Sequence, residues 1–184
     1  MKQTKVIALV GMPGSGKSTC VDHLVEKNFP KVYFGGVIVD ETARRFGEVN
    51  EKNERQVREE LRAQEGLGAV AARVLPKIDE LLQAHETVIA DGLYGWTEYK
   101  ILQEHYGDSI VVIAIVAPRK DRYSRLVHRP IRPLTEEEVK SRDYAEIENS
   151  EKGGPIAYAD YTIVNDGPVE DLLARLDGII GELK

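Results

Sequence analysis

The sequence has little of several features that would narrow its function early. It contains a single cysteine among 184 residues, Cys20, and so forms no disulfide within the chain. No apolar run approaches the roughly 20 residues that a membrane-spanning helix needs. The apolar stretch Val6 to Val10 near the start is too short for a secretory signal. We therefore expect a cytoplasmic protein with no membrane partner.

Positive charge is also scarce. The chain carries 25 Lys and Arg against 31 Asp and Glu, a net charge of -6, whereas a nucleic-acid binder usually has a basic surface. One segment departs from this balance, because residues 119–132 hold six basic residues and one acidic residue. An acidic protein with one concentrated basic segment fits a compact polyanionic ligand better than a long polymer. We expect no nucleic-acid partner.

Short apolar runs alternate with helical patterns along the chain. The run at 6–10 is continuous rather than alternating, as expected for a strand buried on both faces. The predicted strands span residues 6–10, 31–34, 87–90, 110–116 and 161–164. The predicted helices span residues 18–27, 37–46, 51–65, 69–84, 96–105, 119–127, 135–149 and 169–180. This alternation predicts an α/β fold with a parallel sheet covered on both sides.

The domain organisation follows from length and patterning. A chain of 184 residues, 42% of them hydrophobic, suits one domain, and the sequence holds no internal repeat or low-complexity tract. The polar helical segments near 51–65 and 130–152 are predicted to be excursions from one core. Residues 153–155, Gly-Gly-Pro, predict a hinge-like break. We therefore treat residues 1–184 as one domain.

The most informative motif lies at residues 11–18, which match the pattern of a phosphate-binding loop: Gly, four residues, then Gly-Lys-Ser. Glycines let backbone N–H groups approach phosphate oxygens, and the following helix N-terminus favours negative charge. In such a loop the lysine, here Lys17, reaches the β- and γ-phosphates, and the hydroxyl of Ser18 ligates Mg²⁺. Thr19 is more typical of a helix-packing position but is kept with the loop. The candidate nucleotide ligands are Gly11, Gly14, Ser15, Gly16, Lys17, Ser18 and Thr19.

A second candidate metal ligand, Asp91, ends the apolar strand at 87–90. A carboxylate at the C-terminal edge of a parallel sheet lies beside the phosphate-binding loop and can hold Mg²⁺, usually through water. The alternative is that Asp91 only caps the turn with Gly92. We favour metal support by Asp91 together with Ser18.

The arginines of the basic segment recur at intervals of three and four residues: Arg119, Arg122, Arg125, Arg129 and Arg132. On a helix, Arg122, Arg125 and Arg129 share one face. Planar guanidinium groups suit a transferring phosphoryl group and stack on an adenine ring. We favour phosphate contact by Arg125 and Arg129. A solvated helix face stays an equal alternative for the other three arginines, and Arg142 on the next helix is a candidate to return to the same site.

With these motifs in place, the chain resembles the nucleoside-monophosphate-kinase-like P-loop proteins, among them the dephospho-CoA kinases and archaeal adenylate-kinase-like proteins. The resemblance runs nearly end to end. It rests on GMPGSGKST at 11–19, ADG at 90–92, RLVHR at 125–129 and ADYTIVNDGPVEDL at 159–172.

The resemblance implies a three-layer α/β/α P-loop NTPase fold with a five-stranded parallel sheet, an acceptor flap near 36–66 and a lid near 128–152. It implies ATP and Mg²⁺ as cofactors. It maps adenine contact to Arg125 and phosphate contact to Arg129, and places Asn165 and Gly167 in a loop that flanks the donor adenine. With Lys17 and Asp91, the two arginines form the expected catalytic set.

The acceptor half departs from the family pattern. Gly36 and Val39 stand where an aspartate and an acceptor-phosphate arginine usually fall, and Tyr94 stands where an arginine follows the Asp-Gly pair. The alternatives for the missing ligands are Arg44, Arg62 and Arg73.

The expected function is therefore ATP-dependent transfer of phosphate to a nucleotide-like or dephospho-CoA-like acceptor, by a monomer or homodimer. One alternative is an NTPase switch, although the guanine-reading Asn-Lys-x-Asp motif is absent from the sequence. The other is a regulatory nucleotide-binding module without acceptor chemistry.

Overall fold

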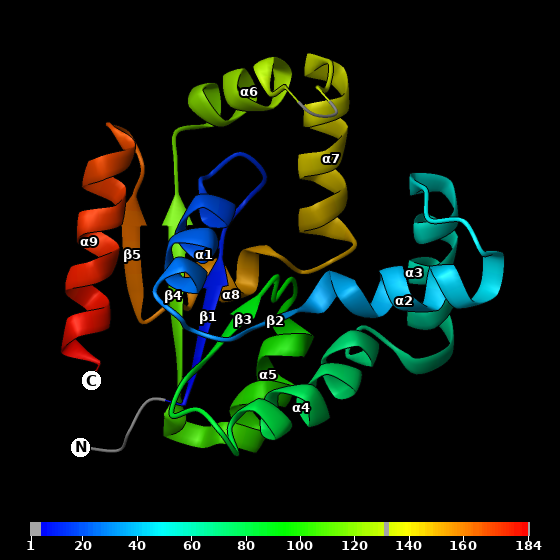
Figure 1. Cartoon of the computed structure of the whole chain (residues 1–184). Coiled ribbons are helices and arrows are strands. Elements are labelled where there is room, and N and C mark those ends of the chain that lie inside the picture. Colours follow the sequence, from blue (N-terminus) through cyan, green and yellow to red (C-terminus); the bar gives the residue numbers. More distant parts are fainter. Residues whose placement is uncertain (1–4, 131–132, 184) are drawn as a thin grey trace.

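The computed structural model describes residues 5–130 and 133–183 (Figure 1). Its five strands form one parallel sheet in the order β2-β3-β1-β4-β5. This confirms the predicted α/β fold and its five-stranded parallel sheet. The strands are β1 (Val6–Val10), β2 (Lys31–Tyr33), β3 (Val88–Asp91), β4 (Ile110–Val116) and β5 (Tyr161–Val164).

Helices connect the strands and cover both faces of the sheet (Figure 1). Those described are α1 (Lys17–Glu26), α2 (Phe34–Phe46), α3 (Glu51–Glu65), α4 (Ala69–Leu81), α5 (Trp96–Tyr106), α6 (Arg119–His128), α7 (Glu136–Glu148), α8 (Gly153–Ala157) and α9 (Val169–Glu182), with a short 3₁₀ turn at Gly107–Ser109. Within the described ranges, none of these helices is long and apolar enough to cross a membrane.

Two sequence predictions about local structure were wrong. Residues 153–155 form the first turn of α8 instead of a hinge-like break. Proline is tolerated in a first turn, where its missing N–H would have no partner within the helix. The helix predicted to begin at residue 37 is α2, which begins at Phe34, so that Gly35 and Gly36 lie in its first turn.

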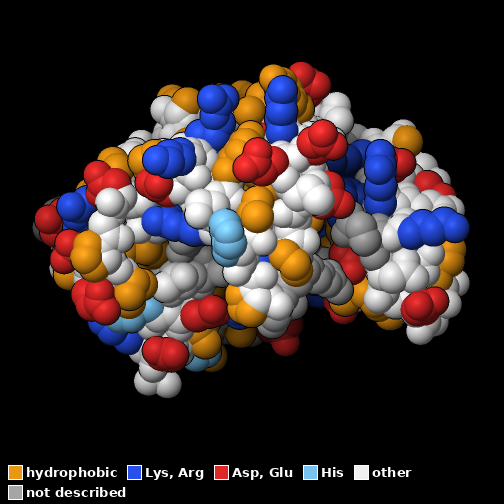
Figure 2. Space-filling view, turned by 90° about the horizontal axis from the view of Figure 1, so that it is seen from above, with side chains coloured by type: hydrophobic (Ala, Val, Ile, Leu, Met, Phe, Trp, Pro, Cys, Tyr) orange, Lys and Arg blue, Asp and Glu red, His pale blue; other side chains and the backbone are white. Residues whose placement is uncertain are grey.

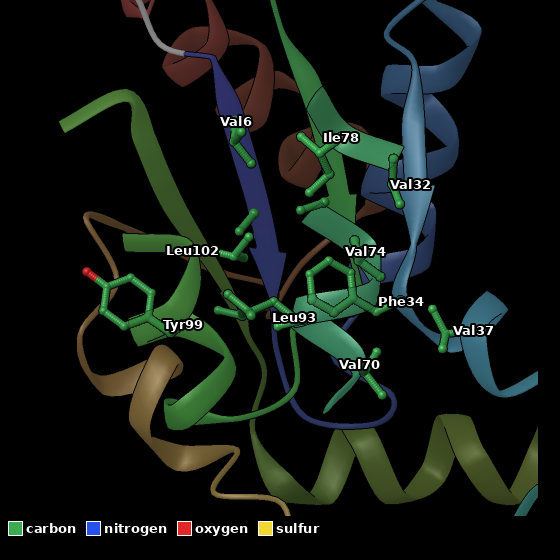
Figure 3. Packing of buried hydrophobic residues seen from close by; sticks show 14 of the residues in the cluster. Val6, Val32, Phe34, Val37, Val70, Val74, Ile78, Leu93, Tyr99 and Leu102 are labelled. Carbon is green, nitrogen blue, oxygen red and sulfur yellow. The ribbon is translucent and has the colours of Figure 1, made fainter. Parts of the chain in front are cut away.

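The hydrophobic core lies on both faces of the sheet, and every residue of β1 is therefore buried. Val6, Ala8 and Val10 point toward one cluster, which includes residues of α4 and α5 (Figure 3). The alternating residues Ile7 and Leu9 point toward the other, which includes residues of α1 and α9. The central strand is thus held from both sides, and the loop that follows it starts from a fixed position.

Two helical segments extend beyond this sandwich. Helices α2 and α3 project from one side of the sheet, while α6 and α7 lie above the C-terminal ends of the strands (Figure 1). The polar α3 buries only a thin apolar stripe, in which Val57 and Leu61 are nearly inaccessible, in agreement with its sequence pattern. A capping box begins α7, since Thr135 and Glu138 accept hydrogen bonds from each other's backbone N–H groups.

Candidate nucleotide-binding site

The glycine loop connects the buried strand β1 to helix α1 and is packed closely from outside. Gly14 has a φ of 76°, and a Cβ there would lie 2.7 Å from the carbonyl oxygen of Arg122. Gly16 has a φ of 101°, and a Cβ there would lie 2.4 Å from Nδ2 of Asn165. Both positions therefore require glycine for backbone conformation and for space. The loop is shaped by its own glycines and by residues from distant parts of the chain.

A buried hydroxyl inside this loop has no hydrogen-bond partner. Ser15 is 1% exposed, and among the described residues its Oγ is the one buried side-chain nitrogen or oxygen atom left without a partner. An unpartnered buried hydroxyl is costly unless a ligand satisfies it. A cradle of glycines around an unsatisfied donor is what an anionic ligand such as a phosphate chain would fill.

Lys17 and Asp91 meet at the C-terminal edge of the sheet. The Nζ atom of Lys17 donates a hydrogen bond to Oδ1 of Asp91, and the two side chains are 19% and 12% exposed. The parallel pairing of β1 with β3 sets Asp91 opposite Leu9, two residues before the loop begins. The sequence prediction that this carboxylate lies beside the loop is confirmed in position.

The residues proposed for Mg²⁺ fit a magnesium site in their chemistry. Ser18 is exposed in the first turn of α1, and the Asp91 carboxylate is close to the loop. Magnesium usually takes one or two protein oxygens and completes its shell with phosphate and water. A serine hydroxyl and one carboxylate beside a phosphate cradle suit that mode.

A cavity of about 200 Å³ opens on the other side of the loop. Arg125 lines this cavity, with Nη1 at 3.2 Å from the Gly14 carbonyl oxygen and Nη2 at 3.3 Å from the Asn165 carbonyl oxygen. The side chain of Asn165 is buried and donates to the Ser15 carbonyl oxygen at 2.8 Å. The structure therefore brings together several residues predicted as nucleotide ligands. The residues that line the cavity are Gly16, Thr19, Arg125, Asn165, Gly167, Val169 and Leu172.

Arg122 does not share the environment of Arg125. It is 7% exposed and forms two hydrogen bonds to the Asp143 carboxylate of α7, at 3.0 and 2.6 Å. Its Nη1 also donates to the Pro13 carbonyl oxygen at 2.9 Å. The alternative that Arg122 contacts phosphate is therefore replaced by a buried ion pair between α6 and α7.

The remaining arginines of the basic segment are placed differently. Arg119 is exposed at the start of α6, and Arg129 directly follows its last residue. The role of Arg129 stays a prediction, and Arg132 lies outside the described residues. Viewed from above, Lys and Arg side chains alternate with Asp and Glu over this face (Figure 2). Among the described residues, basic side chains therefore do not form a continuous patch on this face.

Sequence reasoning missed Glu146 and Lys152, which lie on the Asp91 side of the loop and join Arg142, a candidate from the sequence. Lys152 is 5% exposed, its Nζ donates to Oε2 of Glu146, and it lies 4.6 Å from the centroid of the Tyr94 ring. Burial lowers the pKa of Lys152; the Glu146 carboxylate opposes this shift, and the charge of Lys17 adds to it. Arg142 also bonds Glu146, at 3.0 Å. Neither spacing nor motif marks this cluster, because its members meet only in the folded chain.

The structure also separates the three arginines considered for the acceptor. Arg44 is paired with Glu41 and its side chain is 69% exposed, and Arg73 is paired with Glu65. Arg62 is more buried: burial lowers its pKa, and the neighbouring Glu98 carboxylate opposes the shift. Tyr94 and Glu146 are also within electrostatic range of Arg62. Of the three, Arg62 is the one that faces this cluster.

Comparison with known proteins places the chain in a family. A family model described as an AAA domain matches residues 7–151. A UPF0200 protein of Thermococcus onnurineus is 34% identical over 181 residues, which cover 97% of both proteins. The chain belongs to the UPF0200 family. A UPF0200/UPF0201 protein of Archaeoglobus fulgidus is 38% identical over 183 residues, and this UPF0200 chain spans only 56% of that relative's length.

The fold of this UPF0200 protein also matches that of a solved kinase. The dephospho-CoA kinase from Campylobacter jejuni superposes with a TM-score of 0.56, covering 98% of each chain at 17% identity. At that identity the likeness concerns the fold alone. The P-loop kinase-like fold suggested by the motifs is confirmed, and the chemistry has to be argued from the site.

Proposed function

We propose that this protein is an ATP-dependent phosphotransferase that moves the γ-phosphate of Mg-ATP to a small nucleotide-like acceptor. The observation that carries the proposal is that residues from β3, from α6 and from the segment after β5 meet at the glycine loop. Lys17 reaches Asp91 on one side, and Arg125 closes a cavity against Asn165 on the other. A nucleoside triphosphate can enter that cavity with its base and extend its phosphates along the loop.

The proposed roles follow from these positions. The backbone of Gly11, Gly14, Ser15 and Gly16 binds the phosphates, as the unsatisfied Ser15 hydroxyl supports. Thr19, Asn165 and Gly167 border the base, against which Arg125 packs. Lys17 neutralises charge on the β- and γ-phosphates, and Arg129 contacts phosphate from the end of α6.

Magnesium bound through Ser18 and Asp91 would supply charge neutralisation at the β- and γ-oxygens. The Lys17–Asp91 pair holds both side chains at the loop before a nucleotide enters. We also propose that residues 1–184 form one domain, in which residues 128–152 act as a lid and residues 36–66 as an acceptor flap. Closure of such a lid excludes water and so favours transfer over hydrolysis.

The second candidate is a regulatory nucleotide-binding module without acceptor chemistry. The observation that favours it is the pair Val39 and Tyr94, which stand where acceptor arginines are expected. Arg62, which is within electrostatic range of Tyr94, supports the kinase instead, because it offers a cation for an anionic acceptor.

One assay separates the candidates. Purified protein is incubated with Mg-ATP and a panel of AMP, other nucleoside and deoxynucleoside monophosphates, dephospho-CoA and nucleosides, with Lys17→Ala as control. Formation of ADP in equal amount to a phosphorylated acceptor, lost in the control, supports the proposal. ADP with free phosphate and no acceptor product would support an NTPase switch. Tight ATP binding with no turnover across the panel would support the regulatory module.

A further inference from the structure

Lys152 is a buried cation that the proposed reaction does not yet use. Lys152 is 5% exposed. Its ammonium group donates a hydrogen bond to Glu146 and lies against the ring of Tyr94. The ordinary place for a lysine is the surface, since burying an ammonium group is costly unless it is well paired. Here the pairing is shared, because the same Glu146 carboxylate also accepts a hydrogen bond from Arg142.

The order of strands and the contact with Tyr94 together place Lys152 relative to the cavity. Asn165, which borders the cavity, comes directly after β5, whereas the loop follows β1 and Tyr94 follows β3. The sheet order β2-β3-β1-β4-β5 therefore puts Tyr94 and Lys152 across the loop from the cavity. A triphosphate whose base occupies the cavity would present its terminal phosphate toward this side.

The charges around this position are unbalanced. In the three ion pairs seen among the described residues here, Lys17, Arg142 and Lys152 bring three positive charges, and Asp91 and Glu146 bring two negative ones. A terminal phosphate would offset the excess and would give the buried ammonium a second anionic partner. Burial lowers the pKa of Lys152, and the positive charge of Lys17 adds to this shift.

We propose that Lys152 binds the phosphoryl group that is transferred, with Glu146 and the Tyr94 ring holding its ammonium in place until the nucleotide arrives. This inference rests on the proposed function. Lys152 forms and breaks no covalent bond. The acceptor oxygen bonds to the γ-phosphorus, the bond from that phosphorus to the β–γ bridging oxygen breaks, its electron pair leaves on ADP, and the proton of a hydroxyl acceptor passes to water.

The test compares two nucleotides that differ in the γ-phosphate. Binding of Mg-ADP and of the non-hydrolysable β,γ-methylene analogue of Mg-ATP is measured by calorimetry for the wild-type protein and for Lys152→Met. We expect the variant to bind the analogue at least tenfold more weakly and ADP within about twofold of wild type, as for loss of one charge-assisted hydrogen bond. Lys152→Arg should recover part of the lost affinity.

The control is Lys140→Met, on the exposed side of α7, which should bind both nucleotides like wild type. If Lys152→Met folds poorly, the double variant Lys152→Met/Glu146→Gln removes both partners of the pair and should show the same selective loss. An equal loss for both nucleotides, or none for either, would make Lys152 a structural anchor and overturn this inference alone. Failure of the wild type to bind either nucleotide would overturn the proposed function with it.

Discussion

Arg122 of α6 and Asp143 of α7 form a two-bond ion pair in the protein interior, with side chains 8% and 11% exposed. The same guanidinium donates to the Pro13 carbonyl oxygen in the glycine loop. One side chain therefore connects the loop to both helices that lie above it. The position of α7, and with it the Glu146–Lys152 pair, depends on this connection.

Replacing one partner of this ion pair should destabilise the protein more than replacing both partners. Arg122→Met or Asp143→Leu leaves one buried charge without its partner, and we expect each to lower the free energy of unfolding by about 3 kcal/mol. The double variant removes both charges and should cost less than either single variant. Urea denaturation of the four proteins measures this coupling. Arg119→Met, at an exposed position of the same helix, should stay within about 0.5 kcal/mol of wild type. Additive losses would show that the two side chains act independently.

Gly14 offers a test of close packing against the loop, with Gly47 as a matched control. Their φ angles are 76° and 70°, so alanine adopts a similarly unfavourable backbone at both. Only at Gly14 would the new Cβ meet another group, the Arg122 carbonyl oxygen at 2.7 Å, whereas nothing lies within 4 Å at Gly47. We expect Gly47→Ala to cost about 1 kcal/mol and to leave Mg-ADP binding unchanged. Gly14→Ala should lower the melting temperature further and weaken Mg-ADP binding at least tenfold. Equal effects of the two variants would mean that the contact with α6 is unimportant.

The parts of this protein that were predictable from sequence are those set by local pattern. The run Val6 to Val10 and the glycine motif after it depend on neighbours in the chain, and both appear in the structure where expected. Asp91 was placed correctly because the edge of a parallel sheet is itself a consequence of that pattern.

The unpredictable parts are set by contacts between distant residues. Arg122 and Arg125 are three residues apart and look alike in sequence, yet Asp143 of α7 pairs with one and the loop carbonyl of Gly14 with the other. Lys152 precedes a Gly-Gly-Pro stretch that predicts a break in the chain. Its role becomes visible only in the folded protein, where its ammonium group packs against the Tyr94 ring. A charge pattern shows which residues are basic, and packing decides which of them a ligand can reach.

Arg125 should affect the affinity for the donor nucleotide equally whether or not the nucleotide carries a γ-phosphate. Its guanidinium bridges the carbonyl oxygens of Gly14 and Asn165 beside the cavity. We expect Arg125→Met to weaken Mg-ADP and the methylene analogue of Mg-ATP by similar factors of about ten, because the lost contact is with the base and not the terminal phosphate. Calorimetry with both nucleotides measures the ratio, and Lys120→Met, exposed on the same helix, is the control. A loss confined to the triphosphate would move Arg125 to the phosphate side.

Glu98 should make the stability of the protein depend on pH. Its carboxyl group is 2% exposed and accepts hydrogen bonds from the N–H groups of Tyr94 and Gly95, at 2.8 and 3.2 Å. Burial raises the pKa of Glu98 to about 7 from an ordinary 4.5, although the two N–H groups act in the opposite direction. Between these values the folded protein holds a proton that the unfolded chain has lost. The contribution of Glu98 to the free energy of unfolding therefore falls as pH rises from about 4.5 to 7, by at most about 3 kcal/mol, and levels off above.

Glu98→Gln isolates this effect because glutamine keeps a carbonyl oxygen for both N–H groups and cannot ionise. We expect the stability of the variant, relative to wild type, to increase between pH 5 and pH 8 by a few kcal/mol. Urea denaturation of both proteins at pH 5, 6, 7 and 8 gives this difference directly, since all other titrating groups are shared and cancel. Glu104→Gln, on the exposed side of the same helix, should give a difference that hardly changes with pH. Parallel curves for Glu98→Gln and wild type would mean that the buried carboxyl keeps the same pKa in both states.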